Sequence, residues 1–198
     1  GVSWPMKYLV AIPVYNEKSQ LAGVLAKTLE YPVDVLVVDD GSTDGTADVI
    51  RQFPTVRVLR HPTNRGYGAS LSDSFQYAID HDYDVVITMD SDGQHEPALI
   101  PEFLDAIAEV DIVSGSRYLK SFEIDTDAPA ERRRINALVT DELNACMGLG
   151  ITDAFCGFKA YHVPSLKAYD ITELGYAMPL QVWVQAVAAG WRISEFPV

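Results

Sequence analysis

Cysteine is scarce in this sequence. Only two of the 198 residues are cysteines, Cys146 and Cys156. So few cysteines predict neither a disulfide framework nor a zinc site, and they agree with an intracellular chain. We therefore expect both thiols to stay reduced and chemically inert.

Positive charge is also scarce. The chain carries 15 lysines and arginines against 28 aspartates and glutamates, so its formal net charge is −13. This balance excludes nucleic acid as a general partner, because binding a phosphate backbone requires a basic face. The few basic residues are unevenly spread, and three arginines stand in a row at 132–134. This cluster predicts either an anion-binding site or the solvated start of a helix.

Long apolar runs and the common phosphate-binding motifs are missing as well. No run approaches the roughly 18 apolar residues of a membrane-spanning helix, and the N-terminal apolar run is too short and contains a proline, unlike a signal peptide. The sequence has neither G-x-G-x-x-G after its first apolar run nor G-x-x-x-x-G-K-[ST]. Its length and its 48% hydrophobic content are ordinary, so we expect residues 1–198 to form a single soluble domain.

What the sequence does contain is an alternation of apolar runs and helical patterns. It predicts strands at 8–14, 33–40, 56–60, 84–90 and 111–116, and helices at 17–30, 46–53, 68–81 and 97–109. Strands that alternate with helices form a mainly parallel sheet with helices on both faces. The predicted fold class is therefore α/β, with a Rossmann-like sheet.

The second half of the sequence has a different pattern. It predicts a long loop at 117–131, a helix at 132–147, an irregular stretch at 152–162, a helix at 178–190 and a final strand at 191–198. We expect residues 8–116 to bind a nucleotide and the more irregular residues 117–198 to bind an acceptor. A loop as long as 117–131 is usually functional or mobile in a compact domain.

Polar residues follow each predicted strand. They are Tyr15, Asn16 and Glu17 after the first, Asp39, Asp40, Ser42 and Asp44 after the second, Asn64, Gly66 and Gly68 after the third, Asp90, Asp92, Gln94 and His95 after the fourth, and Arg117 after the fifth. Ligands of open parallel sheets bind beyond the carboxyl ends of the strands. The sequence therefore predicts a site along this edge, although "DDGSTDGT" and "NRGYG" each also fit an ordinary turn without a ligand.

Asp90 and Asp92 are the strongest of these signals. Two carboxylates at positions i and i+2 of a strand end repel each other unless a cation lies between them. Oxygen ligands, with Gln94 beside them, suit Mg²⁺ or Mn²⁺ better than zinc. Such an ion typically bridges to phosphate and neutralises a diphosphate leaving group. The pattern predicts a metal site that binds a nucleotide diphosphate.

The motifs also carry a family resemblance. "PVYNE", "VVDDGSTDGT", "NRGYGAS" and "MDSDGQH" resemble, in this order and spacing, the family 2 inverting glycosyltransferases of the GT-A fold. "GSRY", "RRR", "DAFCGFKAY" and "GWRISEFPV" are similar to the branch that contains dolichol-phosphate mannosyltransferase and polyprenyl-phosphate glucosyltransferases. The resemblance covers roughly residues 8–198. It implies transfer of a hexose, with inversion, from a GDP-mannose or UDP-glucose type of donor to a polyprenyl or dolichyl phosphate.

The resemblance also implies roles for individual residues. It implies contacts to the nucleotide sugar from Pro13, Tyr15, Glu17, Asp40 (on the base), Ser42, Asn64, Gly68 and Asp90. It implies Asp90 and Asp92 as the DxD metal ligands, assisted by Gln94, and it implies Arg117 with Arg132 or Arg133 as the binding site of the acceptor phosphate. Asp90, Asp92 and Arg117 would be the catalytic residues.

A polyprenyl phosphate is already an anionic nucleophile, so it requires positive charge rather than a base. A glycan or small-molecule hydroxyl as acceptor would instead require a base, for which Asp153 or Asp127 is the candidate. A sugar nucleotidyltransferase is a more remote alternative, because "AIPVYNEKSQ" lacks the glycine-rich loop that would hold a nucleoside triphosphate. A catalytically idle nucleotide-binding module is the last alternative, and the intact aspartate pair argues against it.

The departures from the branch pattern lie on the acceptor side. Gln181 and Gln185 replace a glutamate and an arginine, Lys159 replaces an arginine, and Asn136 replaces a serine. Many relatives continue into membrane-spanning helices after the segment that ends this chain. We therefore expect a cytoplasmic protein at the cytoplasmic face of a membrane, held there by peripheral contact or by a membrane-spanning continuation.

Overall fold

The computed structural model describes residues 6–119 and 129–198. Within these residues, seven strands form one sheet in the order β3-β2-β1-β4-β6-β5-β7. The strands are β1 (Tyr8–Val14), β2 (Asp34–Asp39), β3 (Arg57–Arg60), β4 (Val85–Thr88), β5 (Ile112–Ser116), β6 (Lys159–His162) and β7 (Ile193–Pro197). Among them only β6 runs antiparallel to its neighbours. The predicted α/β class and mainly parallel sheet are confirmed.

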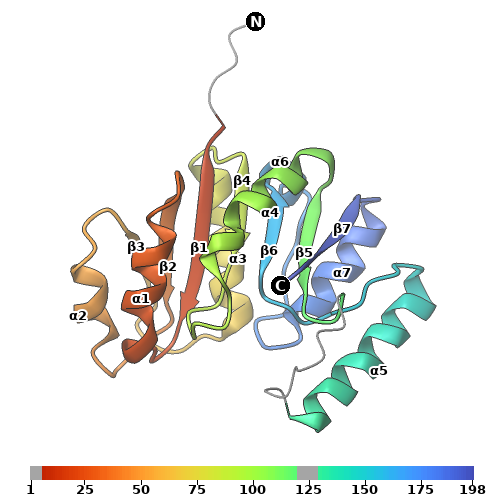
Figure 1. Ribbon diagram of the computed structural model, residues 1–198, viewed down its shortest axis with the longest axis horizontal. Coiled ribbons are helices and arrows are strands. Elements are labelled where there is room, and N and C mark those ends of the chain that lie inside the picture. Colours follow the sequence, from red (N-terminus) through yellow and green to blue (C-terminus); the bar gives the residue numbers. More distant parts are fainter. Residues whose placement is uncertain (1–5, 120–128) are drawn as a thin grey trace, which may run out of the picture.

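Helices cover both faces of the sheet (Figure 1). They are α1 (Lys18–Thr28), α2 (Thr46–Arg51), α3 (Tyr67–Asp80), α4 (Ile100–Ala106), α5 (Ala130–Met147), α6 (Val163–Leu166) and α7 (Met178–Ala188), with short 3-10 turns at Pro97–Leu99 and Ile107–Glu109. The helices α1, α2 and α4 pack on one face, and α3, α6 and α7 pack on the other. The predicted helix 97–109 is thus α4 flanked by two 3-10 turns.

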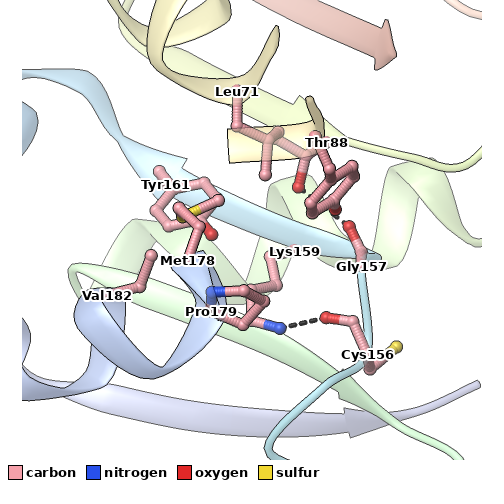
Figure 2. Close-up of a pocket in the computed structure, with 10 residues that line it drawn as sticks. Leu71, Thr88, Cys156, Gly157, Lys159, Tyr161, Met178, Pro179 and Val182 are labelled. Carbon is pink, nitrogen blue, oxygen red and sulfur yellow. Dashed lines mark hydrogen bonds between the residues drawn. The ribbon is translucent and has the colours of Figure 1, made fainter. Parts of the chain in front are cut away.

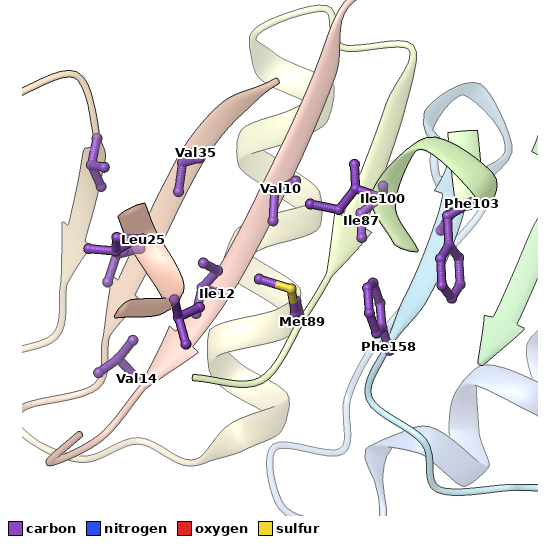
Figure 3. Packing of buried hydrophobic residues seen from close by; sticks show 14 of the residues in the cluster. Val10, Ile12, Val14, Leu25, Val35, Ile87, Met89, Ile100, Phe103 and Phe158 are labelled. Carbon is purple, nitrogen blue, oxygen red and sulfur yellow. The ribbon is translucent and has the colours of Figure 1, made fainter. Parts of the chain in front are cut away.

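Alternate side chains of β1 enter the two cores. Val10 and Ile12 pack toward α1 and α4, whereas Leu9 and Ala11 pack toward α3, and all four are fully buried. Figure 3 shows the first of these cores, in which Leu25 of α1 lies against the strands. Burial on both faces explains why the strands read as continuous apolar runs.

The prediction of an irregular stretch at 152–162 is wrong for its last four residues. Lys159–His162 form β6, which lies inside the sheet between β4 and β5. The segment is short and begins with a lysine, so its sequence carries no strand period. The acceptor-side half is also more regular than predicted, because β6 and α6 were not expected, whereas α7 and β7 correspond to the predicted helix at 178–190 and the predicted strand at 191–198.

Two further observations concern the second half of the chain. Most of the predicted loop 117–131, including Asp127, lies outside the described residues. In the part of the chain that the structure describes, no helix combines the length and the apolarity needed to cross a bilayer.

Candidate functional site

The predicted site lies along one edge of the sheet. The parallel strands β1, β2, β4 and β5 all end there, at the lower edge in Figure 1, and α5 lies beside the same edge. The order of the strands sets the order of the polar groups along this edge. The residues that follow β4 stand two strands away from those that follow β5, with β6 between them.

Asp90 and Asp92 lie in a tight loop that His95 closes. The backbone N–H of Asp90 donates to Nδ1 of His95 at 3.0 Å, so the ring proton is on Nε2, which lies 3.6 Å from Oδ2 of Asp90. Asp92 is exposed and accepts the backbone N–H of Gln94 at 3.0 Å. Gly93 has a positive φ of 82°, which the loop requires and glycine adopts easily.

The electrostatics of this loop favour a bound cation. Burial raises the pKa of Asp90 and the Asp92 carboxylate raises it further, although His95, Lys159 and Arg117 oppose the shift. Burial also raises the pKa of Glu17, and Asp92, Asp44 and Asp90 add to it. The structure therefore brings Glu17 from the end of β1 into the field of the aspartate pair. A divalent cation stabilises the ionised form of carboxylates that raise one another's pKa.

The described residues contain no group of three or more His, Cys, Asp or Glu that would hold a metal by protein ligands alone. Mg²⁺ and related ions at phosphate sites do not require such a group, so a metal site at Asp90 and Asp92 stays a prediction. Such ions use one or two carboxylates and take their other ligands from water and from the phosphates of the substrate. Asp90 and Asp92 fit that pattern, and Gln94, which is exposed beside them, would assist.

Gly157 borders Asp90, although the sequence indicated it only as part of the motif "DAFCGFKAY". A Cβ at this position would lie 2.8 Å from Oδ1 of Asp90 and 3.1 Å from the hydroxyl of Tyr67. The hydroxyl of Thr88 donates to the carbonyl of Gly157 at 2.9 Å and holds the turn in place. Only glycine leaves room for the Asp90 carboxylate here. In the sequence, the glycine of "CGF" is therefore the feature that could have indicated this close approach.

Behind this turn lies a small pocket between α3, β6 and α7 (Figure 2). Lys159 lines it and is only 3% exposed. Its ammonium donates to the carbonyl of Cys156 and lies 5.3 Å from the centre of the Trp183 ring. Burial lowers the pKa of Lys159. The lysine that departs from the branch pattern therefore braces the turn that borders Asp90.

The loops after β1 and β2 are tied to each other. The backbone N–H of Asn16 donates to Oγ of Ser42 at 3.0 Å, and the side chain of Asn16 accepts the N–H of Thr43 at 2.8 Å. Asn16 has a positive φ of 53°, a conformation that asparagine tolerates better than most residues. Pro13 lies in β1 one residue before its end, and Tyr15 is half exposed beside these loops. Ser42 thus helps to hold the two loops together, in addition to its predicted contact with the nucleotide sugar.

Asp40 is turned into the protein. It is 4% exposed, and its carboxylate accepts the backbone N–H groups of Arg65 at 2.7 Å and Gly66 at 2.9 Å. Nδ1 of His61 lies 2.7 Å from Oδ1 of Asp40. Asp40 therefore anchors the "NRG" loop, and its contact with the base stays a prediction. In neighbouring Asp39, Oδ2 accepts no hydrogen bond from the described residues.

His61 is held between two carboxylates. Its Nε2 lies 2.6 Å from Oδ2 of Asp73, opposite the contact with Asp40. Burial works against a charge on the ring, but the hydrogen bonds with Asp40 and Asp73 outweigh burial and raise the pKa of His61. Both ring nitrogens face carboxylate oxygens, so these surroundings favour the doubly protonated form of the ring.

This arrangement predicts a pH-dependent stability. Because the pKa is raised in the folded state, the stabilisation is fully present below about pH 6.5, the unfolded value, and is lost as the pH rises through the folded pKa. His61→Asn is expected to lose about 2 kcal/mol of unfolding free energy at pH 6 and much less at pH 9. Urea unfolding at both pH values measures this. The exposed His81, whose ring contacts the carbonyl of Tyr77, is the control. Equal losses for His61→Asn at both pH values would contradict a charged ring.

The glycines of "NRGYG" are explained by chain packing. The backbone N–H of Gly68 donates to the carbonyl of Leu174 at 2.9 Å, and a Cβ on Gly66 or Gly68 would collide with the backbone at 173–174. Asn64 is exposed beside this loop. A role of Asn64 and Gly68 in binding the nucleotide sugar stays a prediction.

The two glutamines that depart from the branch pattern clamp the same segment. The side chain of Gln181 accepts the N–H groups of Thr172 at 3.0 Å and Glu173 at 2.9 Å. The side chain of Gln185 accepts the N–H of Asp170 at 2.8 Å. A neutral amide side chain is therefore sufficient to hold the backbone that covers the "NRGYG" loop.

Arg117 is paired with a carboxylate that the sequence proposed for another role. Its Nε and Nη2 donate to Oδ2 and Oδ1 of Asp153 at 2.8 and 3.0 Å, and Asp153 is fully buried. Burial works to raise the pKa of Asp153, but the hydrogen bonds from Arg117 outweigh it and hold the pKa below its usual value. A buried carboxylate in a two-pronged ion pair is a poor general base.

Arg132 and Arg133 lie in the first turn of α5, and this helix lies beside the edge of the sheet at which β5 ends (Figure 1). Arg132 is exposed, Arg133 is half-buried and its backbone N–H donates to the carbonyl of Pro129 at 3.2 Å. The triple arginine is thus the start of a helix, as one of the two sequence interpretations has it. A role of Arg132 and Arg133 in binding the acceptor stays a prediction.

The match to a family model and the similarity to individual known proteins agree with each other. The family model described as Glycosyl transferase family 2 matches residues 9–170. The chain is 33% identical to undecaprenyl-phosphate mannosyltransferase of Micrococcus luteus, over 98% of this chain and 83% of that protein. It is 29% identical to polyprenol monophosphomannose synthase of Mycolicibacterium smegmatis, over 96% of this chain and 76% of that protein.

Solved structures show the same fold. Glucosyl-3-phosphoglycerate synthase from Mycobacterium tuberculosis, in complex with Mn²⁺, UDP-glucose and phosphoglyceric acid, superposes with a TM-score of 0.74. The match has 20% sequence identity and covers 97% of this chain and 69% of that one. At this identity the likeness concerns the fold, and it confirms the predicted GT-A architecture.

Proposed function

The chain belongs to glycosyl transferase family 2, and from that premise we propose that it transfers a hexose from a nucleotide sugar to a polyprenyl phosphate. One observation carries the choice of acceptor. An acidic cluster, made of Glu17, Asp90 and Asp92, stands at the ends of β1 and β4, whereas the cation of Arg117 stands at the end of β5 on the same edge of the sheet. The nearby Asp153 is buried and paired with Arg117. Such a site suits an acceptor that is already an anion.

The donor side of the proposal rests on the aspartate loop. Asp90 and Asp92, with Gln94, would hold a Mg²⁺ or Mn²⁺ ion, which when bound neutralises the charge of the diphosphate leaving group. The solved relative with the same fold carries Mn²⁺ and UDP-glucose. The loops of Tyr15, Glu17 and Ser42, which hydrogen bonds tie together around Asn16, would border the nucleotide.

The acceptor side rests on the arginines and on α5. Arg117, with Arg132 or Arg133, would bind the phosphate, because guanidinium groups form strong charge-assisted hydrogen bonds with phosphate oxygens. Nε and Nη2 of Arg117 are bonded to Asp153, so Arg117 would reach the phosphate through its remaining N–H groups. On the same helix Ile135 and Leu138 are 50% and 59% exposed and lie on one helical face. Exposed apolar side chains beside arginines fit a polyprenyl chain or the membrane surface that holds it. The relatives named for undecaprenyl phosphate and polyprenol support this acceptor class.

In the proposed reaction a phosphate oxygen of the acceptor attacks the anomeric carbon while the nucleoside diphosphate leaves from the opposite side. This single displacement inverts the anomeric centre and forms no covalent intermediate with the enzyme. The acceptor loses no proton to a base, so Arg117 acts by orienting the phosphate and offsetting its charge. We place the reaction at the cytoplasmic face of a membrane, where a cytoplasmic donor meets a lipid acceptor.

Calorimetry with GDP-mannose and UDP-glucose, each with Mn²⁺ and with EDTA, tests the donor side. We expect metal-dependent binding of one donor, and transfer from that donor to a polyprenyl phosphate in detergent. Binding that EDTA leaves unchanged would contradict the metal site. Transfer to a sugar hydroxyl, with none to the lipid phosphate, would contradict the acceptor class.

A further inference from the structure

The helix α5 docks through polar side chains. Within Ala130–Met147, all of which the structure describes, the buried residues are Asn136 and Thr140, at 5% and 2% exposure. Asn144 continues the same stripe one turn later, since positions i, i+4 and i+8 share a helical face. A helix at the surface of a globular protein normally buries an apolar stripe instead. Near its C-terminal end α5 does have apolar contacts, through Leu143 and Met147.

All three polar side chains bind one segment, residues 151–154. Nδ2 of Asn136 donates to Oδ1 of Asp153 at 2.8 Å, and the hydroxyl of Thr140 accepts the N–H of Ala154 at 3.2 Å. The amide of Asn144 bonds both the carbonyl and the N–H of Ile151, at 2.7 and 2.9 Å. The helix α5 is therefore held to this segment by hydrogen bonds along its length, and Asn136 is the tie nearest its N-terminal end.

The contact of Asn136 differs from the other two because it reaches Arg117. The Asp153 carboxylate accepts Nδ2 of Asn136 on the oxygen that also accepts Nη2 of Arg117. On its other side Asn136 accepts the hydroxyl of Thr140 at 2.9 Å, so both ends of its amide are used. One buried carboxylate thus ties α5 to the residue that follows β5.

Arg132 and Arg133 precede Asn136 by four and three residues, which places all three on one face of the helix. We propose that Asn136 is a positioning residue that holds the first turn of α5 in register with Arg117, so that arginines from two elements face one acceptor phosphate. This inference rests on the proposed function for the identity of the ligand. The hydrogen-bonded tie itself depends on no ligand.

Asn136→Leu tests the proposal, and Asn144→Leu is the matched control, because Asn144 ties the same helix to the same segment without touching Asp153. For Asn136→Leu we expect the KM for polyprenyl phosphate to rise about tenfold or more, while donor binding with Mn²⁺ stays within about twofold. For Asn144→Leu we expect the acceptor KM to stay within about twofold. Equal rises in KM for both variants would overturn the proposal, because they would indicate only general loosening of α5.

Hydrogen exchange gives a readout that needs no substrate. We expect Asn136→Leu to speed amide exchange at 131–138 by about tenfold or more, and Asn144→Leu to act mainly at 141–151. Should Asn136→Leu fail to fold, Thr140→Val removes the hydroxyl that orients Asn136 and is expected to act in the same direction. Unchanged exchange at 131–138 would overturn the tie. A wild-type protein that ignores polyprenyl phosphate, with exchange changed as expected, would overturn the proposed function and leave the tie standing.

Discussion

Asp90→Asn is expected to reduce sugar transfer by about a thousandfold or more, because the metal that stabilises the leaving diphosphate supplies several kcal/mol and each 1.4 kcal/mol is tenfold in rate. The substitution keeps the shape of the side chain, so the loop that His95 closes is expected to persist. Isothermal titration of Mn²⁺, with and without the donor, together with transfer kinetics measures the effect.

The same substitution is not expected to destabilise the fold. Asp90 lies in the field of Asp92 and Glu17, and burial raises its pKa, so removing its charge relieves repulsion. The unfolding temperature is therefore expected to stay the same or to rise while transfer is lost. Asp105→Asn on α4 is the control, since Asp105 is exposed on another part of the surface. A variant at Asp90 that still binds donor in a metal-dependent way would contradict the assignment.

Arg117→Met is expected to lose most transfer, about a hundredfold or more, while binding of the donor with Mn²⁺ is kept. The reason is that Arg117 stands at the end of β5, away from the aspartate loop at the end of β4. The single variant is also expected to lose about 3 kcal/mol of stability, because it leaves the fully buried Asp153 without its partner. Urea unfolding and transfer kinetics measure the two effects.

A second substitution separates the catalytic loss from the structural one. Combining Arg117→Met with Asp153→Asn removes the unpaired charge and is expected to restore most of the stability, since Asn136 and the N–H of Phe155 still have an oxygen to donate to. Transfer is expected to stay low. Recovery of transfer in the double variant would show that Arg117 serves only to pair with Asp153, and loss of donor binding would count against its acceptor-side role.

The amino-acid sequence determined those features that depend on local patterns. The apolar runs of β1, β2 and β4, separated by helical periods, are sufficient to predict a parallel sheet. The direction of parallel strands then places Glu17, Asp90 and Arg117 at one edge, because all their carboxyl ends meet there. The aspartate pair at positions i and i+2 indicated a metal site for the same reason, since the repulsion between neighbouring carboxylates is a local property.

Only the tertiary structure decided which distant residues meet. It inserted the short β6 between β4 and β5, which buries Lys159 and sets Gly157 against Asp90. It paired Arg117 with Asp153, which lies 36 residues further along the chain. This ion pair makes Asp153 a poor general base. Such pairings depend on strand order and on the desolvation of particular oxygens, and both arise when remote segments pack together. Neither has a period or a spacing that a reader of the sequence can detect.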